Sequence, residues 1–222
     1  MMNDLDKTIS EIIYLIENMC FFWKNSHGWA PEEVYNEFNN LEMDRLADFA
    51  KNLRKFNKEE MSEGELVLAY TTMGSILEGV MVIFYTMWLE AYNSDVKEEE
   101  CRQISELKDG QIYDYKYRKW NKKENDYMKP SELNLELLKV FSAERLFTKY
   151  DDKSIKFWKK YITNIQENRN SIHIMKKRNI DEFETFSEKL ELLLELIKLV
   201  DSKLIYPEGY HHGMRNLYRL FN

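Results

Sequence analysis

The chain has 222 residues, 44% hydrophobic and 32% charged, which is typical of a soluble globular protein large enough for one core. Its formal charge of −7 excludes a protein that attracts nucleic acid through a global basic field, so any RNA binding would depend on local patches. Only seven glycines and three prolines are present, so we expect long, uninterrupted helices.

The N-terminal part of the chain is predicted to be helical. Apolar residues at helical spacing predict a first amphipathic helix that ends before Ser26. They are Leu5, Ile9, Ile12, Ile16, Met19 and Trp23. Gly28 and Pro31 mark a turn, and Pro31 suits the first position of the next helix, or pair of helices, which runs to about Phe56. Its inward-facing residues are expected to be Leu46, Phe49 and Leu53.

Residues 66–92 form the most apolar part of the sequence, and a membrane span has to be weighed against a buried helix. Glu78 divides the stretch into two runs, each shorter than the roughly 18 apolar residues that a span requires. We therefore expect a buried central helix and no membrane insertion, with a membrane-associated protein as the alternative. Glu78 would need a partner inside the bundle, and Arg169 is one candidate.

The cellular compartment follows from the cysteines and the first residues. Cys20 and Cys101 are too few for a disulfide framework. The first eight residues contain two acidic groups and no basic segment leading into a cleavable apolar run. We expect a cytoplasmic protein.

Residues 95–130 differ in composition and are interpreted as a surface insertion in a single domain spanning residues 1–222. Between residues 112 and 120 aromatic and polar residues alternate, as in a strand or an extended loop. Basic residues outnumber acidic ones seven to four across residues 108–129. Tyr115, Tyr117 and Trp120 could therefore stack on the bases of single-stranded RNA. Alternatively, they pack on the bundle or on a second subunit.

The C-terminal half contains three further predicted helices. One begins near Ser131, and Tyr150-Asp151-Asp152 is an N-cap region for the next. The last long helix begins after a capping-box-like segment at residues 179–182, and Pro207 and Gly209 end it. Its apolar stripe is expected to be Phe183, Phe186, Leu190, Leu193, Ile197, Val200 and Leu204.

The helix after Asp152 contains the strongest candidate site. Ile155, Trp158, Ile162 and Ile165 recur at steps of three and four, and this register continues onto Arg169 and then Ile172. A guanidinium in an apolar stripe is costly unless it pairs with a carboxylate or binds a phosphate.

His173 is four residues beyond Arg169, so the two side chains are expected on the same side of the helix, one turn apart. An imidazole can transfer the proton of a 2′-hydroxyl, and a guanidinium can stabilise charge at phosphorus. Together they are the minimum for cleaving RNA without a metal.

The segment Arg169-Asn170-Ser171-Ile172-His173 resembles the signature of the HEPN superfamily, in which an arginine and a polar residue precede a histidine. The resemblance implies an all-α, antiparallel helical bundle that dimerises across the motif. It also implies a metal-independent endoribonuclease of a toxin–antitoxin or phage-defence system, with a possible antitoxin partner. The catalytic residues would be Arg169, Asn170 and His173.

The chain departs from this pattern in its spacer. Only three residues separate the arginine from the histidine, fewer than is usual in the family, which changes their relative helix phase. A second interpretation is therefore a non-catalytic helical dimer that binds a nucleotide, RNA or a partner protein at the same cleft. Lys176, Lys177 and Arg178 either contact RNA phosphates beside the motif or cap the end of the helix.

Other common enzyme classes lack support in the sequence. There is no glycine-rich phosphate loop and no HExxH zinc motif. His211 and His212 have no carboxylate or cysteine at ligand spacing, and His27 is expected to be structural. We expect neither a metal nor a cofactor.

Overall fold

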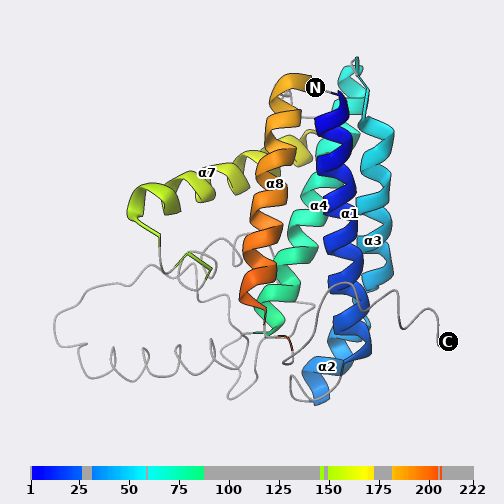
Figure 1. The fold of residues 1–222 in the computed structure, drawn as a ribbon, viewed down its shortest axis with the longest axis vertical. Helices are drawn as coiled ribbons and strands as arrows, with labels where there is room; N and C mark the ends of the chain where they lie inside the picture. Colours follow the sequence, from blue (N-terminus) through cyan, green and yellow to red (C-terminus); the bar gives the residue numbers. More distant parts are fainter. Residues whose placement is uncertain are drawn as a thin grey trace.

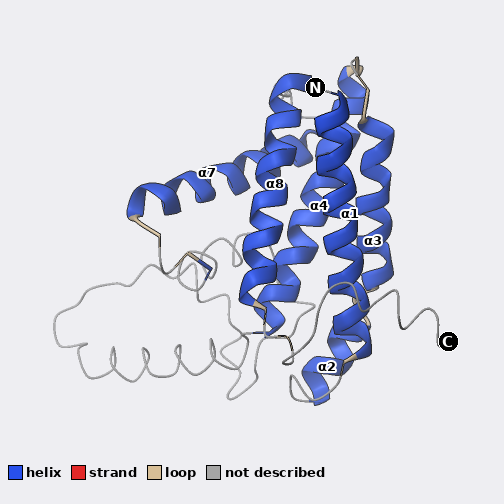
Figure 2. Cartoon of the chain, in the orientation of Figure 1, coloured by secondary structure: helices blue, strands red, loops and turns tan. Residues whose placement is uncertain are grey.

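A computed structural model describes residues 2–26, 32–58, 60–87, 146–147, 150–172, 182–204 and 206. The regular elements in these ranges are all helical, which confirms the predicted all-α fold (Figures 1 and 2). The elements are α1 (Met2–Asn25), α2 (Glu32–Asn39), α3 (Met43–Asn52), η1 (Leu53–Phe56), α4 (Glu63–Met87), α7 (Asp152–Arg169), η6 (Asn170–Ile172) and α8 (Phe183–Lys203). The insertion expected at residues 95–130 and the helix expected from Ser131 lie outside the described residues.

Four helices form the bundle in the described part of the chain: α1 contacts α3 and α8, and α4 contacts the same two helices from the other side. In Figure 1 α3 runs opposite to α1 and α4, whereas α8 runs in the same direction as both. Ring contacts agree with this direction. Tyr70 near the start of α4 packs on Phe186 near the start of α8, with 5.3 Å between centroids. Tyr206, just after α8, lies 5.5 Å from Trp23 near the end of α1. The bundle is therefore not uniformly antiparallel.

The apolar stripes of α1 and α8 form the core as their spacing predicts. Every predicted core residue of α1 is buried, and so is every one of α8 except the half-buried Phe183. The expectation for the second helical region is wrong at one position. Leu46 and Leu53 are buried, but the Phe49 side chain is 37% exposed, and Ala50 occupies the buried position beside it. The buried register of α3 runs through Met43, Leu46, Ala50 and Leu53, so Phe49 lies at the edge of the packed side.

The apolar segment forms α4, whose buried residues lie at the centre of the bundle. By length and composition alone α4 could cross a membrane, but 56% of its most apolar window is buried inside the protein. The core helix of a soluble protein passes the same test, and the burial agrees with the expected central helix.

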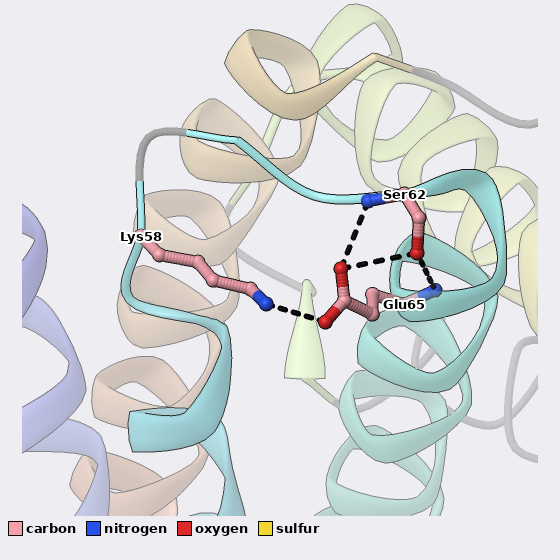
Figure 3. A network of polar contacts seen from close by, with 3 residues as sticks. All are labelled: Lys58, Ser62 and Glu65. Atoms are coloured by element: carbon pink, nitrogen blue, oxygen red, sulfur yellow. Dashed lines mark hydrogen bonds and ion pairs between the residues drawn. The ribbon is translucent and has the colours of Figure 1, made fainter.

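The start of α4 is held by a capping box (Figure 3). The Ser62 backbone N–H donates to Glu65 Oε2 over 2.9 Å, and the Glu65 N–H donates back to Ser62 Oγ. Lys58 adds an ion pair to the other carboxylate oxygen. The hydrogen bonds from Lys58 and Ser62 lower the pKa of Glu65 from 4.5 to about 2.

α7 leaves this arrangement and crosses it obliquely, with its N-terminal end projecting from the bundle in Figure 1. The Asp151 carboxylate caps the helix by accepting a 2.7 Å hydrogen bond from the Ser154 N–H, which confirms the expected N-cap region. The same hydrogen bond lowers the pKa of Asp151. On its buried side, Trp158 stacks on Phe147 with 6.0 Å between centroids.

Candidate functional site around Arg169

Arg169 is the last residue of α7, where this helix meets α4. Its side chain lies across Gly74: a Cβ added there would lie 2.8 Å from Arg169 Cδ and 3.1 Å from Arg169 Cβ. No side chain larger than hydrogen fits without a shift of the arginine. Gly74 therefore lets α7 approach α4 closely enough for the guanidinium to reach along the surface of α4.

The guanidinium pairs with Glu78, one turn beyond Gly74 on α4. Nη1 of Arg169 donates to Glu78 Oε2 over 2.6 Å, and each side chain is 31% exposed. Arg169 was one candidate partner for Glu78, and this ion pair confirms that candidate. The arginine thus occupies the apolar stripe with a carboxylate beside it, and about a third of its side chain stays open to solvent.

The helical register does not continue past Arg169. The next three residues form the 3₁₀ helix η6, and Asn170 is the C-cap of α7, with its N–H bonded to Gln166 O and Asn168 O. Ile172, expected in the buried stripe, is 48% exposed because the 3₁₀ turn changes the helical phase. A position for His173 one α-helical turn above Arg169 requires a continuous α-helix, whereas residues 170–172 form a 3₁₀ helix.

A polar cluster beside Arg169 did not emerge from the sequence. Asn168 is 4% exposed, and its Nδ2 donates to Asn164 O and Asn164 Oδ1 over 3.0 and 3.1 Å. Asn164 Oδ1 also accepts from Lys189 Nζ of α8, which lies 5.4 Å from the ring centroid of Tyr70. The signal available in sequence was an asparagine pair at i and i+4 on the buried side of a helix.

Tyr161 joins the same region to α8. Its hydroxyl donates to the Lys189 backbone oxygen over 2.8 Å. Burial, with a smaller contribution from nearby Tyr70, raises the pKa of Tyr161 well above its ordinary value. This tyrosine is therefore a neutral hydrogen-bond donor that fixes α7 on α8.

The predicted site residues divide into two groups. Arg169 and Asn170 are described and adjacent, and Asn170 is half-buried at the helix end. The others lie outside the described residues: His173, Lys176, Lys177, Arg178, Tyr115, Tyr117 and Trp120. The same holds for His27, His211 and His212.

Elsewhere, a groove of about 290 Å³ separates α1 from α3. Its lining carries two ion pairs, Lys24 with Asp44 and Lys51 with the half-buried Glu17, and the buried Cys20. Within the described ranges, no three His, Cys, Asp or Glu side chains come together as a metal site.

No protein-family model, no curated protein and no solved structure matches this chain.

Proposed function

We propose that this protein is a HEPN-like, metal-independent endoribonuclease of a toxin–antitoxin or phage-defence system, acting as a cytoplasmic homodimer. Arg169 binds the scissile phosphate, His173 transfers the proton, and Asn170 orients one of them. Support comes from the sequence motif together with the environment of Arg169.

One observation carries the proposal: Glu78 holds the Arg169 guanidinium in place, but further N–H donors of the guanidinium remain available to a ligand. Its contact with Glu78 runs through Nη1, and the side chain remains 31% exposed. A guanidinium has five N–H donors in a planar fork, so the remaining donors can bind a phosphate while Glu78 fixes the group. Glu78 thus pre-orients the arginine, which lowers the cost of ordering it on RNA.

The reaction is an intramolecular transesterification. His173 accepts the proton of a ribose 2′-hydroxyl, and the 2′-oxygen forms a bond to phosphorus while the bond to the 5′-oxygen breaks. The leaving 5′-oxygen takes up a proton, which gives a 2′,3′-cyclic phosphate and a 5′-hydroxyl. Arg169 stabilises the charge on the non-bridging oxygens. A second subunit would add another histidine for the second proton transfer.

The test is RNA cleavage by purified protein in excess chelator. Wild type is expected to cut single-stranded RNA and leave 2′,3′-cyclic phosphate ends. His173→Ala and Arg169→Ala are each expected to lower the rate by about 100-fold or more. Lys198→Ala is a matched control, because this lysine pairs with Glu11 between α8 and α1, whereas Arg169 lies where α7 meets α4. Cleavage that is equal in wild type and His173→Ala would end the proposal.

The ion pair also favours a second candidate, a non-catalytic dimer that binds RNA, a nucleotide or a partner protein at this position. Here Glu78 is a structural counter-ion and Arg169 joins α7 to α4. Cleavage by wild type separates the two functions, and Glu78→Gln tests the role of the ion pair. For a nuclease with a pre-oriented arginine this variant loses cleavage rate, whereas for the non-catalytic dimer wild type has no activity and the variant changes only stability.

A further inference from the structure

The outward side of α7 is strongly basic in an otherwise acidic protein. Lys153, Lys156, Lys159 and Lys160 are all exposed. Residues 150–172 contain five basic and three acidic residues, while the whole chain has a formal charge of −7. α7, which projects from the bundle in Figure 1, therefore carries a local excess of positive charge.

Three of these residues form a line, named here the lysine stripe: Lys153, Lys156 and Lys160. Their spacing of three and then four places them on one side of the helix. They span about 10 Å at 1.5 Å per residue, roughly the length of three phosphates of a stacked strand.

The lysine stripe has no counter-ion in the described part of the chain. None of its three ammonium groups forms an ion pair there, in contrast to Arg169 at the end of the same helix. Like charges three and four residues apart repel one another on a helix, and Asp152, four residues before Lys156, offsets only part of this repulsion. An external polyanion would remove this repulsion.

An aromatic ring lies within the stripe. Phe157 is four residues after Lys153 and three before Lys160, and its side chain is 49% exposed. The ring is held edge-to-face against Trp158 at 5.4 Å, and Trp158 in turn stacks on Phe147. A fixed, exposed ring between lysines offers stacking to a base and charge to the flanking phosphates.

We propose that the outward side of α7 is a binding surface for single-stranded RNA, with the lysine stripe on the phosphates and Phe157 under a base. Phe157 favours nucleic acid over an acidic peptide, because carboxylate side chains have no flat ring to stack. The inference rests on the proposed substrate class but not on the cleavage step. Arg169 lies on the opposite, bundle-facing side of the helix.

The test is fluorescence polarisation with a labelled single-stranded 2′-O-methyl oligoribonucleotide, which has no 2′-hydroxyl to react and so reports binding alone. Three phosphate contacts predict that the logarithm of the affinity falls with the logarithm of salt with a slope of about −2. The triple variant Lys153→Glu/Lys156→Glu/Lys160→Glu is expected to bind at least about tenfold more weakly, with a flatter slope.

A charge-matched control reverses three basic residues elsewhere: Lys7, Arg54 and Lys55, all exposed on α1 and η1. This variant is expected to keep most of the wild-type affinity. Phe157→Ala changes no charge and is expected to lose about fivefold in affinity with an unchanged salt slope. Circular dichroism checks each fold, and Lys→Gln replacements in the stripe serve if the triple Glu variant does not fold.

Two results would overturn the inference: equal loss in both triple variants, or tighter binding of a glutamate-rich peptide than of the oligonucleotide. Cleavage of unmodified RNA is measured separately. Binding through the stripe without cleavage keeps this inference and removes the nuclease. If wild type cleaves RNA but the triple Glu variant binds the oligonucleotide normally, the nuclease proposal stands and this inference is refuted.

Discussion

The two sides of α7 differ in whether their cations form ion pairs. On the side facing the bundle, the single cation, Arg169, is paired with Glu78, and Gly74 makes room for it. On the outward side, four lysines are exposed, and none of them pairs within the described residues. One helix thus presents a positioned guanidinium on one side and an uncompensated basic surface on the other.

The difference shows which charges determine how the helices pack. A cation among apolar neighbours must be satisfied by a partner, so its position fixes how two helices meet. Exposed lysines contribute little to stability, and their arrangement is free to serve a ligand. Variants that exchange these roles test the comparison.

The largest expected effect is the difference in stability between a substitution on the buried side of α7 and one on its outward side. Trp158→Ala removes a side chain that is 7% exposed and stacked on Phe147, so it should lower the free energy of unfolding by about 3–5 kcal/mol. Lys156→Ala should change it by no more than about 0.5 kcal/mol. Urea unfolding followed by circular dichroism measures both. Similar losses in the two variants would contradict the assignment of the sides.

Gly74→Ala comes next. The added methyl group meets the inner part of the Arg169 side chain, so we expect a loss of about 1–3 kcal/mol even though alanine favours helix. Gly64→Ala is the matched control, because its Cβ meets nothing within 4 Å. It should stabilise by up to about 1 kcal/mol. Thermal unfolding of both variants is the measurement, and stabilisation by Gly74→Ala would show that α7 does not press on α4.

The ion pair itself should show a smaller coupling. In a double-mutant cycle with Arg169→Gln and Glu78→Gln, we expect a coupling energy of about 1 kcal/mol, since both side chains are 31% exposed and screened by solvent. The coupling should fall with added salt. A value near zero would mean that Glu78 does not hold the arginine.

The smallest effect concerns a third charged contact, the capping box of α4. The pKa of Glu65 is about 2 in the folded protein, so its stabilisation is present above pH 4.5 and is lost as the pH falls toward 2. The stability difference between wild type and Glu65→Gln should therefore shrink over that interval. Denaturant unfolding at several pH values measures it. A difference that does not vary with pH would refute the lowered pKa.

The spacing of apolar residues in the sequence correctly predicted the buried residues of helices that face the core with one side. The stripes of α1 and α8 follow from the 3.6-residue period, and the Asp151 cap follows from a carboxylate before a free N–H group. These features depend on residues within a few positions of one another, so residue spacing alone contains them.

Features that depend on distant residues were decided by packing. Glu78 and Arg169 are 91 residues apart, and the sequence offered their pairing only as one of several options. The crossing of α7 over α4 at Gly74 brings the two side chains together. The outward turn of Phe49 and Ile172, and the direction of α8, likewise depend on how helices approach one another and where they end. A helical period shows which side of a segment is apolar, but steric fit between segments decides which neighbour covers it.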